Sequence, residues 1–143
     1  MTVLLDAFAL IALLRGEPAA DEVETILRRG DAAISAVNLA EALDVLQRVD
    51  GADPARIEAV TGPLVRESLA LLPVDERTAR GAAGVRARRY HRTRAPLSLA
   101  DCLLVAAAAE AEGSIATADR PLASAARAEG LEVVALPDSR GRR

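Results

Sequence analysis

Two kinds of segment alternate along this chain, and they differ in how their apolar and polar residues are spaced. Short apolar runs rich in Leu or β-branched residues indicate buried strands, and longer Ala- and Leu-rich runs with helical spacing indicate helices. The predicted strands are residues 2–5, 32–35, 70–73, 114–117 and 132–135. The predicted helices are residues 8–14, 18 to a stop near 30, 38–49, 53–69, 75–89, 98–112 and 121–129. This alternation favours a parallel sheet of four to five strands covered on both faces, a three-layer α/β/α fold.

The length of the chain fits a single domain. A chain of 143 residues suits one hydrophobic core. We expect residues 1–137 to form the domain and residues 138–143 to be a flexible tail. The helix predicted at residues 53–69 contains the pair Gly62-Pro63, which should bend or break it.

Four acidic residues stand where predicted strands end or where predicted helices begin. Asp6 directly follows the first strand, and Asp119 follows the fourth. Glu41 and Asp101 are expected in the first turns of two helices. Because the carboxyl ends of parallel strands meet at one edge of a sheet, we expect all four acids near that edge.

Each of these acids is flanked by Leu and Ala rather than by polar residues. Such an acid is usually paired or binds a ligand. A simpler interpretation takes each acid singly as a helix cap. The caps would be Asp6, Asp119, the pair Asn38/Glu41 and the pair Ser98/Asp101. Asp44, one turn after Glu41, could be a further ligand, although an exposed helix acid is the simpler interpretation.

As a set, four converging carboxylates need a positive partner. Each close pair of like charges would cost about 4 kcal/mol at an effective dielectric of roughly 20, and a divalent cation would offset that repulsion. The single His91 and the single Cys102 leave no competing His- or Cys-rich metal site. Ligands that are all oxygen select a hard ion, Mg²⁺ or Mn²⁺, and the typical chemistry of such ions is phosphoryl transfer.

The amino-acid composition excludes several other functions. All 18 basic residues are Arg and none is Lys, which excludes a P-loop, a Schiff-base enzyme, a class A β-lactamase and a protein kinase. The missing Lys also argues against a haloacid-dehalogenase-like phosphatase and a phosphoacceptor receiver domain. The former would in addition need a second Asp at the position of Phe8. With Tyr90 as the only other aromatic residue, a base-stacking platform is excluded as well.

Charge is distributed unevenly along the chain. The net charge is −3, yet seven Arg residues and no acid lie between Glu76 and Asp101. A basic segment on an acidic protein indicates a polyanionic partner. The alternative is a solvated helix face whose Arg side chains cover apolar surface.

The apolar opening of the chain is not typical of a targeting segment. No basic residue precedes it, and Asp6 interrupts it, so it predicts neither a signal peptide nor a membrane span. We therefore expect a cytoplasmic protein with no membrane partner.

Around the four acids the sequence resembles the PIN-domain ribonucleases, and within them the VapC-type toxins of toxin–antitoxin pairs. The resemblance covers nearly the whole chain and rests on four fragments in the same order. They are VLLD at residues 3–6, ISAVNLAE at 34–41, LSLADCLLVAA at 97–107 and ATADRPL at 116–122. The resemblance implies a PIN-like nuclease domain over residues 1–137.

The resemblance also implies a site. The catalytic residues and metal ligands would be Asp6, Glu41, Asp101 and Asp119, which would hold one or two Mg²⁺ or Mn²⁺ ions. Metal-activated water would hydrolyse an RNA phosphodiester and leave a 5′-phosphate and a 3′-hydroxyl. Thr117 would orient a carboxylate or the water, and Asn38 could support the site, although helix capping alone would explain Asn38. At Phe8 many family members carry Ser or Thr, and a buried helix residue is the simpler interpretation of this Phe.

The expected partners follow from the same resemblance. They are an RNA substrate, a cognate antitoxin protein, a second copy of the chain in a homodimer, and operator DNA reached only through the antitoxin. In the basic segment the candidate RNA contacts are Arg86, Arg88, Arg89 and Arg92. The alternative function is a catalytically degenerate PIN-like domain that only binds protein or RNA.

Overall fold

The computed structural model describes all residues, 1–143, and its centre is a five-stranded parallel sheet. The strands are β1 (Val3–Leu5), β2 (Ala32–Ser35), β3 (Ala70–Leu72), β4 (Ser114–Thr117) and β5 (Val133–Ala135). Their order across the sheet is β3-β2-β1-β4-β5. Leu5 at the end of β1 stands opposite Ile34 of β2 and Ala116 of β4. The parallel sheet and its predicted number of strands are confirmed.

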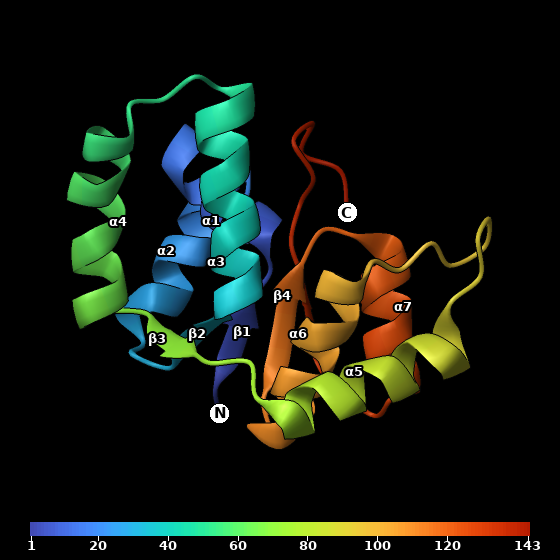
Figure 1. The fold of residues 1–143 in the computed structure, drawn as a ribbon. Helices are drawn as coiled ribbons and strands as arrows, with labels where there is room; N and C mark the ends of the chain where they lie inside the picture. Colours follow the sequence, from blue (N-terminus) through green and yellow to red (C-terminus); the bar gives the residue numbers. More distant parts are fainter.

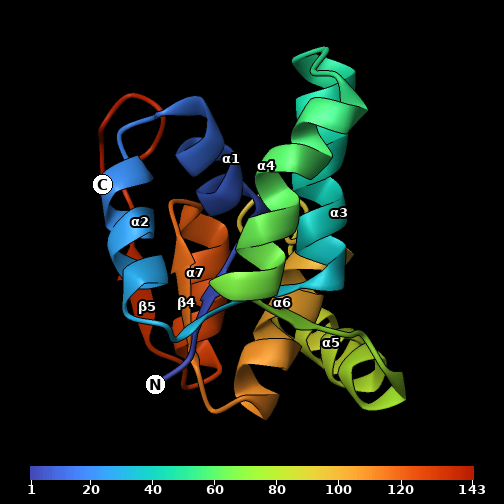
Figure 2. The same ribbon diagram turned by 90° about the vertical axis from the view of Figure 1, so that its left-hand side faces the viewer.

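Seven α-helices surround the sheet (Figures 1 and 2). They are α1 (Ala7–Arg15), α2 (Ala20–Arg28), α3 (Ala36–Asp44), α4 (Pro54–Glu67), α5 (Glu76–Arg89), α6 (Leu99–Glu110) and α7 (Arg120–Ala128). A π-helical segment (Val45–Val49) extends α3. None of these helices combines the length and the apolar character needed to cross a membrane.

Each face of the sheet has its own hydrophobic core, because successive strand residues point to opposite sides. Leu5 packs in a cluster with Leu10 of α1 and Val23 of α2. Its neighbour Leu4 packs in a second cluster with Leu104 of α6, joined by residues of α5 and α7. The sheet therefore lies between two helical layers, and the predicted three-layer α/β/α fold is confirmed.

Helices α3 and α4 form an antiparallel pair that rises beyond the carboxyl end of β2 (Figures 1 and 2). Pro63 lies inside α4, and the helix continues through it, so Gly62-Pro63 does not break the helix, and the expected bend stays a prediction. The proline removes one hydrogen bond, to the carbonyl of Ala59. Both Pro63 and Ala59 are exposed, so water can hydrate that carbonyl and the helix tolerates the loss.

Residues 138–143 fold back onto the domain. The Arg143 guanidinium forms an ion pair with Glu22 of α2 and donates to the Ala135 carbonyl over 2.7 Å. Asp138 pairs with Arg142 over 2.9 Å. The flexibility expected for this segment stays a prediction, and these contacts place the segment beside the carboxyl end of β5.

The close approach of Gly113 to β1 gives a test of the fold. A Cβ at Gly113 would lie 2.6 Å from the Thr2 carbonyl oxygen, which accepts the Ser114 amide at the start of β4. Gly113→Ala should therefore lower the free energy of unfolding by about 2 kcal/mol, measured by chemical denaturation.

The matched control is Gly84→Ala in α5. The only side chain near a Cβ at Gly84 is that of Arg88, which can move aside, and Ala favours a helix over Gly by up to about 1 kcal/mol. Gly84→Ala should therefore be neutral or stabilising. An equal loss of stability in both variants would contradict the packing described at Gly113.

Candidate active site

Asp6 occupies the junction between β1 and α1 and is the N-cap of that helix. The Ala9 amide donates to its Oδ1 over 2.7 Å, and the Thr117 hydroxyl at the end of β4 donates to its Oδ2. Only 6% of Asp6 is exposed. Burial raises the pKa of Asp6 from 3.8 to about 7, with smaller contributions from the charges of Asp119 and Asp101, although both hydrogen bonds lower it.

Glu41 is oriented by a chain of hydrogen bonds that begins at Ser35. The Ser35 hydroxyl donates to Asn38 Oδ1 over 2.6 Å, and Asn38 Nδ2 donates to Glu41 Oε2 over 3.1 Å. Ser35 and Asn38 are each 1% exposed. Because Ser35 occupies the amide oxygen, the NH₂ group of Asn38 is directed at the carboxylate. Burial raises the pKa of Glu41, against the hydrogen bond from Asn38, and the charge of Asp101 raises it further.

The beginning of α3 corrects one prediction. The helix begins at Ala36 rather than at residue 38, and its N-cap is Ser35, which accepts the Asn38 amide over 3.2 Å. Glu41 therefore lies in the second turn rather than the first, and the predicted capping box of Asn38 and Glu41 is wrong. Capping does not explain Asn38, whose side chain bonds to Ser35 and Glu41. Ser35 was not among the predicted site residues, although a Ser directly before a helix is a recognisable N-cap signal.

Asp101 lies in the first turn of α6, in the predicted capping box with Ser98. The Ser98 amide donates to Asp101 Oδ2 over 3.0 Å, and the Asp101 amide donates to the Ser98 hydroxyl over 3.0 Å. No protein group donates to Oδ1. Burial raises the pKa of Asp101, against the two bonds to Ser98, and the charge of Asp119 raises it further.

Asp119 is the N-cap of α7 and is exposed to solvent. Its Oδ1 accepts the Leu122 amide over 2.9 Å, and its own amide donates to the Thr117 hydroxyl over 3.0 Å. Because the same hydroxyl donates to Asp6, Thr117 links the two carboxylate-bearing turns that follow β1 and β4.

We refer to Asp6, Glu41, Asp101 and Asp119 as the carboxylate cluster. The charge of Asp101 raises the pKa of both Asp6 and Glu41, and the charge of Asp119 raises the pKa of Asp6 and Asp101. No member of the cluster takes part in an ion pair. The fold thus brings the four acids near the carboxyl edge of the sheet without an arginine to neutralise them.

The donor chemistry of the cluster fits a hard divalent cation, since every candidate ligand is a carboxylate oxygen. Uncompensated negative charge on partly buried groups favours such an ion. No group of three or more His, Cys, Asp or Glu side chains in the structure is positioned to hold a metal ion. A shared cation would therefore require the carboxylates to move toward one another from positions in which they repel.

Two neighbouring residues have ordinary structural roles. Asp44, one turn beyond Glu41, forms an ion pair with Arg48 over 2.8 Å, and about half of its side chain is exposed. Phe8 is partly buried and packs against the hydrophobic cluster on the α1 face of the sheet. Both residues therefore fit the simpler interpretations given to them from the sequence.

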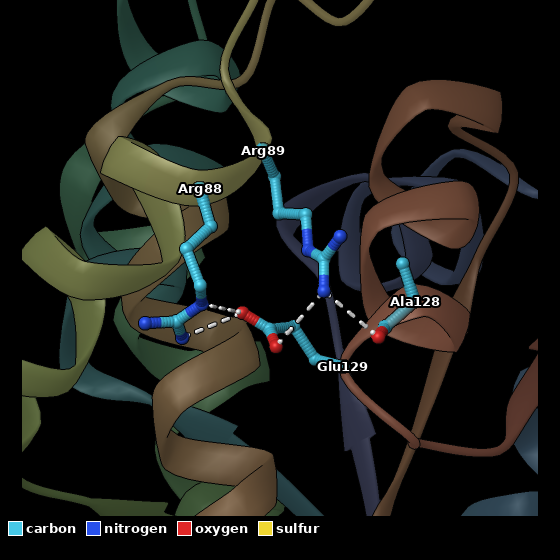
Figure 3. Close-up of polar contacts among 4 residues, drawn as sticks. All are labelled: Arg88, Arg89, Ala128 and Glu129. Atoms are coloured by element: carbon cyan, nitrogen blue, oxygen red, sulfur yellow. Dashed lines mark hydrogen bonds and ion pairs between the residues drawn. The ribbon is translucent and has the colours of Figure 1, made fainter.

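The arginines of α5 are largely engaged in contacts within the domain. Arg88 and Arg89 both form ion pairs with Glu129, at 2.7 and 3.5 Å, and Arg89 also donates to the Ala128 carbonyl (Figure 3). These contacts join α5 to the end of α7. The candidate RNA contacts Arg88 and Arg89 stay a prediction, and binding RNA there would compete with Glu129.

The two remaining candidates of the basic segment differ in their surroundings. Arg86 donates to the Leu97 carbonyl over 3.2 Å, and its guanidinium lies over the Tyr90 ring at 4.5 Å from the centroid. Arg92, in the loop after α5, is exposed and makes no side-chain hydrogen bond or ion pair. Of the four predicted RNA contacts, only Arg92 is free.

Comparison with known proteins identifies the family of this chain. A family model described as the PIN domain matches residues 3–128. The chain belongs to the PIN domain family. No curated protein sequence matches the chain. PIN domains are generally nucleases, and the recognition made from the sequence fragments is confirmed at the level of the family.

Solved structures share the fold of this PIN domain. FitAcB from Neisseria gonorrhoeae has a TM-score of 0.63 and 25% sequence identity, over 92% of this chain and 96% of that chain. VapBC from Salmonella typhimurium, bound to DNA, has a TM-score of 0.72 and 19% identity, over 94% and 98%. VapBC2 from Rickettsia felis, bound to a promoter DNA fragment, has a TM-score of 0.67 and 14% identity, over 95% and 99%.

The raised pKa of Asp6 predicts a pH-dependent stability in the metal-free protein. Between about pH 4 and pH 7 the folded state holds a proton that the unfolded state has released, so the free energy of unfolding falls as the pH rises. The full loss is at most about 4 kcal/mol, because a tenfold change in proton affinity corresponds to about 1.4 kcal/mol. Asp6→Asn should remove most of this loss and be the more stable protein at pH 8.

The measurement is urea denaturation of both proteins in EDTA across this pH range. Asp44→Asn is the matched control, since Asp44 is exposed and paired with Arg48. If the free energy of unfolding depended on pH in the same way for the wild type and for Asp6→Asn, the pKa of Asp6 would not be raised in the folded protein.

Proposed function

We propose that this PIN domain is a Mg²⁺- or Mn²⁺-dependent endoribonuclease and the toxin component of a toxin–antitoxin pair. The observation that carries the proposal is the carboxylate cluster, in which four acids from separate parts of the chain have no cationic partner and the charges of Asp101 and Asp119 contribute to raising the pKa of neighbouring acids. Asp6, Glu41, Asp101 and Asp119 would be the metal ligands. When bound, the ion supplies a Lewis acid that stabilises the charge developing on a phosphate and promotes deprotonation of water.

The residues around the cluster would hold the carboxylates in place for this chemistry. Thr117 donates to Asp6, and Asn38 donates to Glu41. Ser98 occupies one oxygen of Asp101 and leaves the other free. These hydrogen bonds reduce the number of orientations that Asp6, Glu41 and Asp101 must give up when a ligand binds.

The proposed partners rest on the structural likenesses. The VapBC structures from Salmonella typhimurium and Rickettsia felis are bound to DNA, and a further structure of this fold is a toxin–antitoxin complex from Klebsiella pneumoniae. We infer a cognate antitoxin that covers the carboxylate cluster, a homodimeric toxin, and contact with operator DNA only through the antitoxin. The absence of a preformed metal group favours one other function, a degenerate PIN-like domain that binds partners without cleaving RNA.

Cleavage is tested with purified, antitoxin-free protein, a structured RNA and Mn²⁺, with EDTA as a control. Asp101→Asn preserves the shape of the capping residue and removes the charge that couples to Asp6 and Glu41. We expect its cleavage rate to fall by about a hundredfold or more, the usual scale for losing electrostatic stabilisation of a transition state. Asp44→Asn should keep the wild-type rate.

Equal cleavage by the wild type and Asp101→Asn would overturn the catalytic assignment. Absence of cleavage by the wild type over several structured RNAs, with RNA or protein binding retained, would favour the degenerate domain.

Metal binding is tested separately from activity. Saturating Mn²⁺ should raise the thermal midpoint of the wild type by several degrees, because a ligand at about 100 times its Kd adds about 2.7 kcal/mol to the stability. The same titration of Asp101→Asn should give a much smaller shift. Identical shifts in the two proteins, or none in the wild type, would remove the carboxylate cluster as the metal site.

A further inference from the structure

A groove lies between α7 and the segment that follows β5, directly beside the carboxylate cluster. Its volume is about 440 Å³, within the range of about 300–1,000 Å³ typical of ligand sites. Thr117 and Asp119 line one end, and Arg120, Arg127 and Arg143 supply its charged walls. An adjoining hollow of about 320 Å³ shares Arg120 and Arg143 with it. We refer to the larger of the two as the arginine groove.

The charges in the arginine groove are only partly neutralised. Arg143 forms an ion pair with Glu22. Arg120 donates over 3.0 Å to the main-chain oxygen of Arg143, and Arg127 makes no side-chain hydrogen bond or ion pair. The Arg127 guanidinium is therefore free to bind an anion, and Arg120 is held only by its bond to Arg143, in contrast to Arg88 and Arg89 of α5, which pair with Glu129.

The position of the groove connects it to the proposed chemistry. Thr117 and Asp119 belong both to its wall and to the surroundings of the carboxylate cluster. Figure 1 shows the segment after β5 rising at the same edge of the sheet as the start of α7. A molecule that leaves the carboxylate cluster past Asp119 thus enters a space lined by arginines.

We propose that the arginine groove binds the phosphate backbone of the RNA strand next to the bond that is cleaved. This inference rests on the proposed nuclease function. A polyanionic strand is repelled by four carboxylates, and the arginines of the groove would offset that repulsion and hold the strand in place. Guanidinium groups also bind phosphate through paired hydrogen bonds. The groove contains no aromatic side chain, so it would contact phosphates rather than stack bases.

Arg127→Gln is the primary variant, because Arg127 has no partner in the fold whose loss could disturb the domain. The double variant Arg120→Gln/Arg127→Gln also removes the charge of Arg120, together with its bond to Arg143. Arg29→Gln is the matched control: Arg29 is exposed, unpaired and follows α2, just before β2 begins and therefore at the amino edge of the sheet. All variants carry Asp101→Asn as well, so that RNA remains intact during the measurement.

The affinity for a short fluorescent RNA stem–loop is measured by anisotropy over a range of salt concentrations. Each groove arginine that contacts a phosphate should add about 0.7 to the slope of log affinity against log salt for a single strand. Relative to the Asp101→Asn parent, we expect the magnitude of the slope to be smaller by about 0.7 for Arg127→Gln and by about 1.4 for the double variant. Binding should be weaker by about threefold to tenfold per arginine removed. Arg29→Gln should keep the parent slope.

A second readout uses enzyme with Asp101 intact. Because the groove lies outside the carboxylate cluster, the double variant should raise KM and leave kcat unchanged. If the slope and KM of the double variant match those of the Arg29→Gln control while the wild type still cleaves RNA, the groove is not the strand-binding surface and the proposed function stands. If the wild type neither binds nor cleaves RNA, both proposals fail.

Discussion

Repulsion between carboxylates dominates the electrostatics at the carboxyl edge of this sheet. A parallel sheet gathers the ends of its strands at one edge, and here that edge receives acids from β1, from α3, from α6 and from the turn after β4. Asp101 is coupled to both Asp6 and Glu41, so no acid of the set is electrostatically independent. Without a neutralising arginine, repulsion at this edge lowers the stability of the domain, and the proposed cation would offset it.

The same side chains that begin the helices also form the candidate site. Asp6, Asp101 and Asp119 each accept an amide hydrogen bond that caps a helix, so the proposed metal ligands also have a structural role. Capping gives each carboxylate a fixed position but does not offset the effect of burial. Asp6 accepts two hydrogen bonds, and burial still raises its pKa to about 7. Desolvation outweighs hydrogen bonding at this position.

The arginines of this acidic protein have two different roles. The arginines of α5 near Glu129 join two helices of one layer, which is a packing role. Arg120 and Arg127 line the same groove as Asp119 and form no ion pair with an Asp or Glu side chain. Exposed pairs of the first kind contribute little to stability, whereas arginines in a groove beside an anionic centre change which molecules can approach it.

Periodicity and local end signals in the sequence determined the strands, the helices and the three-layer class, because each depends on residues close along the chain. The same reasoning found the four acids and the capping box at Ser98, but it placed the start of α3 at Asn38, since Asn and Ser are both good N-caps and local sequence does not choose between them. Tertiary structure decided which charges meet. Glu129 reaches Arg88 across about forty residues, and the arginine groove exists only because β5 pairs beside β4. Such contacts arise from packing between distant segments, which no local pattern encodes.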